Sequence, residues 1–87
     1  MYKYNEAILA EIMDETCVLY NTETNTTHIL NATAKYIWEN CITMSVDDIV
    51  DSIQSQLKDI VERSVIHEDV TKIVIQFLES NLIQAIE

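Results

Sequence analysis

The sequence contains no glycine and no proline among its 87 residues. Without glycine, the chain cannot form a phosphate-binding P-loop, a dinucleotide-binding fingerprint or a G-x-S-x-G nucleophile elbow, which all depend on that residue. Its turns must come from Asn, Asp, Ser and Thr, because these residues tolerate capped or left-handed backbone geometry. The missing glycine therefore excludes several enzyme classes at once.

Basic residues are also scarce, with five Lys and Arg against 15 Asp and Glu, which gives a formal net charge of −10. Affinity for nucleic acids comes largely from clustered Lys and Arg that neutralise phosphates, so this charge disfavours binding to nucleic acid. Acidity of this kind most often serves solubility. Its functional alternative is attraction towards a basic peptide or protein surface.

The chain lacks any apolar run near the roughly 20 residues that a membrane-spanning helix needs. The N-terminal stretch MYKYNEAILAEIMDE does not have the basic and then apolar order of a signal peptide, so we expect a cytoplasmic protein with no membrane partner. Cys17 and Cys41 form no CxxC motif and have no His pair nearby. We expect two reduced thiols, buried or half-buried, rather than a disulfide or a zinc site, and no metal or other cofactor.

Turn-forming residues divide the first third of the chain into three short strand-forming segments. These are AILAEIM at residues 7–13, CVLY at 17–20 and TTHIL at 26–30, with polar turns between them. The spacing predicts a three-stranded antiparallel meander.

Helical periodicity begins after Asn31, a residue that favours the N-cap position. A second helix is expected after the N-cap residue Ser45, and a third from about residue 64 to residue 80, where Asn81 can take the left-handed conformation that usually belongs to glycine. Three strands followed by three helices predict one small α+β domain over residues 1–87. The first helix places four apolar residues on one face, namely Ala34, Ile37, Trp38 and Cys41.

The third expected helix has an unusually wide apolar arc. Its two adjacent stripes cover more of the helix surface than packing against a single partner requires. Burial between the sheet and the other helices explains most of these residues, and part of the arc can line a groove for another molecule. The stripes consist of Val70, Ile73, Val74 and Phe77, and of Thr71, Ile75, Leu78 and Leu82.

No catalytic constellation is visible in the sequence. His28 lies on an expected strand and His67 near the start of a helix, and a lone His is more often a surface residue than a ligand. Cys17 would need a neighbouring base to act as a nucleophile, and nothing in the sequence supplies one. The Asp-rich residues 47–51 lack the spacing of a calcium loop and suit the first turns of a helix. We therefore expect no enzyme activity from this chain alone.

One short motif suggests another class of small acidic protein. The tripeptide DSI at residues 51–53 resembles the D-S-L of acyl carrier proteins, in which the Ser carries phosphopantetheine at a helix N-terminus. Ser52 instead lies within the expected second helix, seven residues after its cap, and the chain begins with strands. The acyl-carrier interpretation is therefore a distant alternative.

Three segments, in order, resemble the PqqD-like family, also called RiPP precursor recognition elements (RiPPs are ribosomally made, modified peptides). ILNATAKYIW at residues 29–38 is similar to the family's L-N-x-T-A-x-x-I-W signature, and SVDDIVDSI at 45–53 to its second helix. DVTKIVIQFLESNLI at 69–83 is similar to the family's last helix, with Asn81 in place of Gly. Residues 41–43 replace the usual D-G after the first helix. The resemblance covers about residues 8–83, which it implies as the core of the domain. The matching positions are Leu30, Asn31, Thr33, Ala34, Ile37, Trp38, Val46, Ile49, Ile53, Asp69, Val70, Leu82 and Ile83.

The resemblance implies a small winged-helix-like fold and a non-catalytic adaptor. Such an adaptor binds the leader segment of a precursor peptide and delivers it to a separate maturation enzyme, either a leader peptidase and cyclase pair, as in lasso-peptide pathways, or a radical SAM enzyme. The leader adds as a strand to the third strand, beside the third helix. Trp38 is then expected to anchor the core rather than contact the peptide. The implied peptide-binding residues are Thr26, Thr27, His28, Ile29, Leu30, Asp69, Val70, Ile73, Val74 and Phe77.

The sequence leaves the orientation of the third strand open. His28 and Leu30 share one face of this strand, while Thr27 and Ile29 share the other, and either face can point to the groove. Lys72 can meet a carboxylate of the leader, although an ordinary solvated lysine is the commoner case. The sequence does not identify the natural product, the leader motif or the partner enzyme.

The remaining alternative, a winged-helix DNA-binding protein, can be tested directly. We expect no tight, saturable binding to a defined DNA duplex near physiological salt, because the net charge of −10 opposes the field of the phosphates. Fluorescence anisotropy of a labelled duplex measures this binding. Saturable binding that is sensitive to the duplex sequence would contradict the adaptor interpretation.

Overall fold

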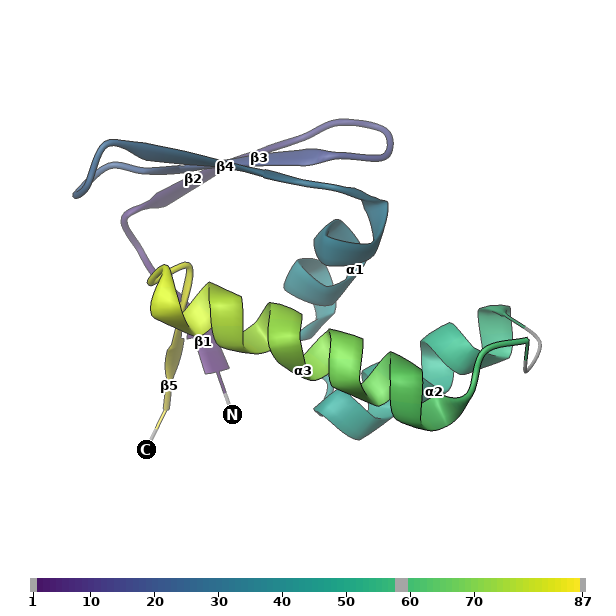
Figure 1. The fold of residues 1–87 in the computed structure, drawn as a ribbon. Coiled ribbons are helices and arrows are strands. Elements are labelled where there is room, and N and C mark those ends of the chain that lie inside the picture. Colours follow the sequence, from purple (N-terminus) through teal and green to yellow (C-terminus); the bar gives the residue numbers. More distant parts are fainter. Residues whose placement is uncertain (1, 58–59, 87) are drawn as a thin grey trace.

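The computed structural model describes residues 2–57 and 60–86 and confirms the predicted α+β, winged-helix-like order of a three-stranded sheet followed by three helices (Figure 1). No helix in these two segments is both long and apolar enough to cross a membrane. The elements are β1 (Tyr2–Tyr4), β2 (Ile8–Ile12), β3 (Cys17–Asn21), β4 (Thr26–Leu30), α1 (Ala32–Asn40), α2 (Val46–Gln56), α3 (Arg63–Glu79) and β5 (Ile83–Ala85).

The strands β2, β3 and β4 form the predicted antiparallel meander, with β4 at one edge. In the turn between β3 and β4, Asn25 adopts the left-handed conformation with a φ of 58°. Its backbone N–H donates to the carbonyl of Asn21 at 2.8 Å, which closes the hairpin. An asparagine thus performs the role that glycine has in many hairpins, as the composition required.

The two faces of this sheet differ in burial. On the inner face, Leu19 of β3 lies opposite His28 of β4, and Cys17 lies opposite Leu30. Leu19, Cys17 and Leu30 are buried, and α3 runs beneath this face (Figure 1). Because side chains alternate along a strand, Ile29 points to the outer face, where it is 74% exposed. The structure therefore settles the orientation that the sequence left open: His28 and Leu30 point inward.

A second sheet of two short strands is absent from the sequence-based prediction. β1 pairs antiparallel with β5, which brings the two ends of the chain together (Figure 1). Leu82 and Ile83, at the start of this C-terminal segment, are buried. The contact is fixed by Asn5, whose backbone N–H donates to the carbonyl of Leu82 at 3.2 Å and whose side chain donates to the carbonyl of Asn81 at 2.8 Å.

The helix boundaries follow the predicted caps. The side chain of Asn31 accepts a hydrogen bond from the N–H of Ala34 at 2.9 Å, and that of Ser45 accepts one from the N–H of Asp48 at 3.1 Å. Each cap satisfies a backbone donor that the first helical turn leaves unpaired. After α3, Asn81 takes the left-handed conformation with a φ of 57°, as predicted.

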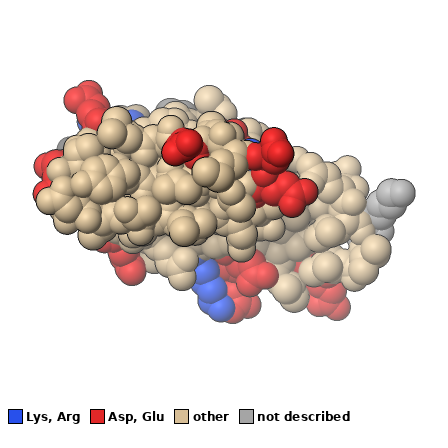
Figure 2. Space-filling model, turned by 90° about the horizontal axis from the view of Figure 1, so that it is seen from above, with Lys and Arg blue, Asp and Glu red and all other residues tan. Residues whose placement is uncertain are grey.

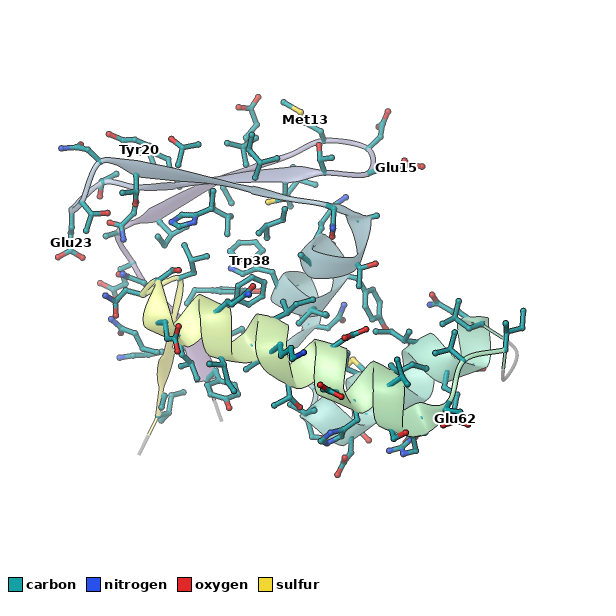
Figure 3. All side chains as sticks on the ribbon, viewed as in Figure 1. Met13, Glu15, Tyr20, Glu23, Trp38 and Glu62 are labelled. Carbon is teal, nitrogen blue, oxygen red and sulfur yellow. The ribbon has the colours of Figure 1, made fainter. Side chains whose placement is uncertain are left out.

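Trp38 lies between the sheet and α3 in a single buried cluster (Figure 3). Its side chain is 7% exposed, and the ring of Tyr4 stacks on it with the ring centroids 4.4 Å apart. The hydroxyl of Tyr4 also donates to the backbone carbonyl of Trp38 at 2.7 Å. The predicted core role of Trp38 is therefore confirmed. The cluster contains Cys17, Leu19, Leu30, Ile37, Trp38, Cys41, Ile49, Val50, Ile66, Val70, Val74, Phe77, Leu82 and Ile83.

Replacing the indole should destabilise the whole domain. We expect Trp38→Ala to lower the free energy of unfolding by about 3–5 kcal/mol, because it leaves a cavity in the buried cluster. Trp38→Phe should cost less, since the buried indole N–H has no hydrogen-bond partner within residues 2–57 and 60–86. Urea unfolding followed by circular dichroism measures both values, with Ile75→Ala at a 46% exposed position as the control. A Trp38→Ala variant of unchanged stability would contradict the core assignment.

Candidate peptide-binding groove

One edge of β4 carries no neighbouring strand in the described part of the chain, because the order of the sheet is β2-β3-β4. Along such an edge, alternate residues direct their backbone N–H and C=O groups away from the sheet. These groups form a template onto which another extended chain can add. The edge is short, since β4 has five residues.

A groove runs between this edge and α3. It consists of two adjoining hollows of about 490 Å³ and 420 Å³. Both are lined by Ile29 and Leu30 of β4 and by Gln76 and Phe77 of α3. One side of the groove is thus a strand with unpaired backbone groups, and the other is a helix that presents side chains. This combination suits an extended peptide better than a compact small molecule.

The groove brings together most of the residues that the sequence predicted for it. Thr26 lies at the hairpin end of β4 and lines neither hollow, while Val70 and Val74 are only 1% and 3% exposed and belong to the core. The other predicted residues line the groove, and their part in binding stays a prediction. They are Thr27, His28, Ile29, Leu30, Asp69, Ile73 and Phe77.

Several lining residues were missed by the sequence analysis or treated there as solvated. Lys72 and Gln76 of α3 line the groove, although apolar periodicity does not select them. Their signal is helical spacing, since positions 69, 72, 73 and 76 follow one another on one side of the helix. The start of α1 and the end of α3 contribute further lining residues: Asn31, Thr33, Ala34, Ser80 and Leu82.

The groove has an apolar floor with charged and polar groups beside it. Leu30 and Phe77 are buried at its base, and Ile73 is half-buried. Above them, the ammonium group of Lys72 pairs with the carboxylate of Glu68 at 3.1 Å, and both side chains are well exposed. This pair stays in water and contributes little to stability. Lys72 is therefore available to exchange Glu68 for a carboxylate on a ligand.

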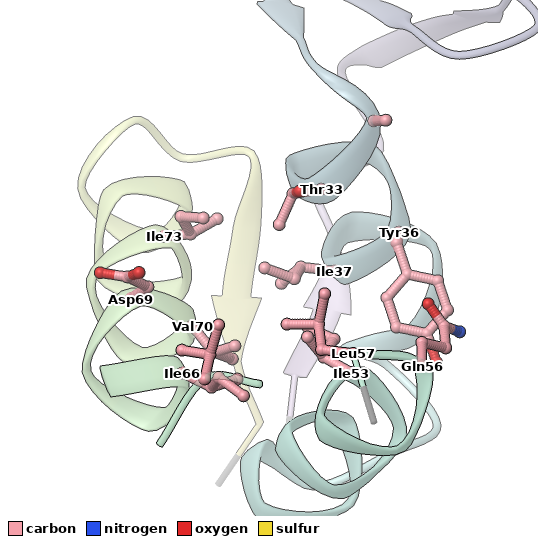
Figure 4. Close-up of a pocket in the computed structure, with 12 residues that line it drawn as sticks. Thr33, Tyr36, Ile37, Ile53, Gln56, Leu57, Ile66, Asp69, Val70 and Ile73 are labelled. Atoms are coloured by element: carbon pink, nitrogen blue, oxygen red, sulfur yellow. The ribbon is translucent and has the colours of Figure 1, made fainter. Parts of the chain in front are cut away.

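A third hollow of about 430 Å³ continues from the groove into the space between α1, α2 and α3 (Figure 4). It shares Thr33, Asp69 and Ile73 with the groove. In Figure 4, Asp69 and Ile73 lie on α3 and Thr33 lies across from them on α1. Most of its remaining lining side chains are apolar, so a peptide longer than β4 can continue from the groove into an apolar pocket. The other lining residues are Ala32, Tyr36, Ile37, Ile53, Gln56, Leu57, Val61, Ile66 and Val70.

The two cysteine thiols do not line this groove. Cys17 and Cys41 form no disulfide and are buried, as predicted. Burial raises the pKa of the Cys41 thiol to about 11 and also raises the pKa of the Cys17 thiol. Neither thiol forms appreciable thiolate near neutral pH, and the thiolate is the reactive form. In residues 2–57 and 60–86, moreover, no group of three or more His, Cys, Asp and Glu is placed to hold a metal ion.

Ser52 is poorly placed to carry a prosthetic group. It lies within α2, and its hydroxyl is 2.6 Å from the hydroxyl of Tyr36 on α1. The side chain is half-buried in this contact between two helices. The acyl-carrier alternative required this Ser to stand free at a helix N-terminus, so the structure disfavours it.

Comparison with known proteins explains this arrangement. The sequence pattern of the PqqD family, described as coenzyme PQQ synthesis protein D, matches residues 16–83. The chain belongs to the PqqD family. This membership confirms the resemblance carried by the three segments, and the match covers β3, β4, all three helices and the start of β5.

Two solved structures share this PqqD-family fold. One is TbiB1 in complex with the TbiA(beta) leader peptide, which has a TM-score of 0.84, 22% sequence identity and a coverage of 98% of both chains. The other is a lasso peptide synthetase B1 complexed with the leader peptide, with a TM-score of 0.85, 21% identity and a coverage of 97% of this chain and 98% of that one. No curated protein sequence gives a significant match.

The PqqD-type signature segment contributes to both the fold and the groove. Leu30, Thr33 and Ala34 line the groove, while Asn31 caps α1. Trp38, at the end of the same segment, packs in the core. One continuous stretch of chain therefore ends the edge strand, starts the helix and shapes the wall between them.

Proposed function

We propose that this chain is a non-catalytic adaptor that binds the leader segment of a ribosomally made precursor peptide by strand addition to β4. The observation that carries the proposal is the unpaired edge of β4 facing a groove walled by α3, in a chain of the PqqD family. The two structures of the same fold, TbiB1 and the lasso peptide synthetase B1, were each solved with a leader peptide, which supports it.

Binding by strand addition divides the work between backbone and side chains. Hydrogen bonds to the β4 edge provide affinity that does not depend on the leader's sequence. Alternate leader side chains then point down towards Phe77 and Ile73, and the others point outward beside Ile29. We therefore expect a leader segment with apolar residues at alternate positions, and a carboxylate near Lys72 where the leader passes that residue.

A separate enzyme acts on the delivered peptide in this proposal. That enzyme is either a leader peptidase working with a cyclase or a radical SAM enzyme, which are the two kinds of partner that the family resemblance implies. The adaptor itself needs no cofactor, because its contribution is to raise the local concentration of the precursor at the enzyme. Identification of the genes next to the one encoding this chain distinguishes the two kinds of partner.

The groove can be located by its response to a leader peptide. A synthetic leader from a neighbouring precursor gene should bind with a Kd between about 10⁻⁵ and 10⁻⁸ M, or roughly −7 to −11 kcal/mol, after the entropic cost of ordering the peptide. Amide chemical shifts should change most at residues 26–30 and 69–77. A proline at a hydrogen-bonding position of the leader should weaken binding, because it removes a donor. Shifts confined to residues 47–51 would instead indicate a plain electrostatic contact and contradict the groove.

A charge placed in the groove should weaken leader binding without unfolding the domain. We expect Ile73→Glu to raise the Kd at least tenfold, or about 1.4 kcal/mol, since it puts a carboxylate on the apolar path of the leader. The matched control is Ile75→Glu, which makes the same change on α3 at an exposed position that lines neither the groove nor the adjoining pocket.

Isothermal titration calorimetry gives both affinities, and thermal melts check that each variant is folded. Because Ile73 also packs against the core, Gln76→Glu serves as a second groove variant at an exposed position. Equal affinities for the Ile73, Gln76 and Ile75 variants would contradict the proposed site.

A further inference from the structure

The outer face of the β2-β3-β4 sheet is an open surface with an apolar centre. The register of the strands places six side chains on this face, which points away from the helices. Leu9 and Ile29 are 62% and 74% exposed there, and Val18 and Tyr20 lie between them. An apolar group of this kind on a sheet face is typical of an interaction surface. The outer face consists of Leu9, Glu11, Val18, Tyr20, Thr27 and Ile29.

Hydrogen bonds hold this face in place at both hairpins. The hydroxyl of Tyr20 donates to the side-chain oxygen of Asn25 at 2.7 Å, which ties the ring to the β3–β4 turn. At the other end, the ammonium group of Lys35 donates to the backbone carbonyls of Met13 and Asp14 at 3.0 Å and 3.1 Å. A surface that is already ordered loses little conformational entropy when a partner binds.

The charge around this face selects the kind of partner. Residues 8–30, which form the sheet and its two hairpin turns, contain four carboxylates and no Lys or Arg, and Lys35 of α1 brings one positive charge to the β2–β3 turn. Glu15 and Glu23 lie at opposite ends of the sheet (Figure 3), and the view onto this face shows a broad uncharged area with carboxylates in and around it (Figure 2). A second copy of the chain would bring the same negative charges together, which opposes self-association. The complementary partner has an apolar centre bordered by Lys and Arg.

We propose that this outer face is the docking surface for the maturation enzyme, and that the enzyme presents an apolar patch with a basic border. The inference rests on the adaptor function proposed above, which requires an enzyme contact that leaves the groove free. The groove lies between the edge of β4 and the side of α3. The outer face is the surface of the same sheet that points away from the helices.

The two surfaces meet along β4 at Thr27 and Ile29, which lie on the outer face, and Ile29 also lines both hollows of the groove while Thr27 lines one. A leader strand added to β4 widens the sheet, so that its outward-pointing side chains extend the outer face past Ile29. The enzyme then contacts adaptor and leader together and binds the loaded adaptor more tightly than the empty one. By thermodynamic linkage, the enzyme tightens leader binding by the same factor.

The experiment compares two matched double variants, each of which replaces an exposed aliphatic residue by Ser and a Glu by Lys. Leu9→Ser with Glu11→Lys alters the outer face, and Ile75→Ser with Glu79→Lys makes the same changes on the exposed side of α3. The probe is the purified peptidase or radical SAM enzyme encoded beside the gene of this chain. Biolayer interferometry measures its affinity for each full-length variant, with and without leader peptide, and fluorescence anisotropy measures leader binding separately.

We expect the outer-face variant to weaken enzyme binding at least about tenfold and to change leader affinity by less than about twofold, because the altered residues lie outside the groove. The α3 variant should match the wild type in both assays, and added salt should weaken the wild-type enzyme complex. Unchanged enzyme binding by the outer-face variant overturns the inference, and so does a wild-type chain that binds no enzyme in either state.

The same measurements separate this inference from the adaptor function. If the wild-type chain binds no leader, the proposed function itself fails. If leader binding stands but enzyme binding ignores Leu9 and Glu11, only the docking surface is wrong. Sedimentation that reveals a dimer broken by the outer-face variant would assign this face to a second copy of the chain and overturn the enzyme assignment.

Discussion

The joint between β4 and α1 is the constraint on which the rest of the structure depends. The strand ends at Leu30 and the helix begins at Ala32, so a single residue, Asn31, sets the angle between them. Its cap hydrogen bond contributes only about 1 kcal/mol, which is small beside the burial of the core. Its importance is geometric, because it directs α1 away from the sheet (Figure 1) and places Trp38 under the inner face. The indole and the other core side chains of α1 then support α3. This helix forms one wall of the groove, and the edge of β4 forms the other.

The helix α3 serves the core and the groove with adjacent parts of one surface. Val70 and Val74 face the core, Ile73 and Gln76 face the groove, and Phe77 lies on the boundary. This double role accounts for the stripe of Val70, Ile73, Val74 and Phe77, whereas Ile75 in the adjacent stripe is 46% exposed and lines neither the groove nor the adjoining pocket. It also means that a substitution at Phe77 changes stability and groove shape together, whereas the exposed position Gln76 reports on the groove more cleanly.

The parts of the fold that the sequence predicted are those determined by local interactions. The three strands of the meander, the caps at Asn31 and Ser45 and the left-handed Asn81 each depend on a few neighbouring residues. The β1–β5 pair was missed because three-residue strands show no periodicity, and the two strands meet only when α3 returns the chain to Asn5. Gln76 was missed for a different reason: apolar periodicity does not select a polar residue, although its helical spacing places it on the same side of α3 as Asp69 and Ile73.

An unpaired strand edge beside an apolar groove is also a route to self-association, and the chain limits this risk in two ways. The edge has only five residues, so a second copy of β4 gains few backbone hydrogen bonds from it. The net charge of −10 adds repulsion between copies, and residues 8–30 carry four of the carboxylates that contribute to it. A basic surface, such as the border proposed for the maturation enzyme, feels the opposite force. Solubility and partner attraction, which composition alone presents as alternatives, are therefore two results of the same charge acting on different molecules.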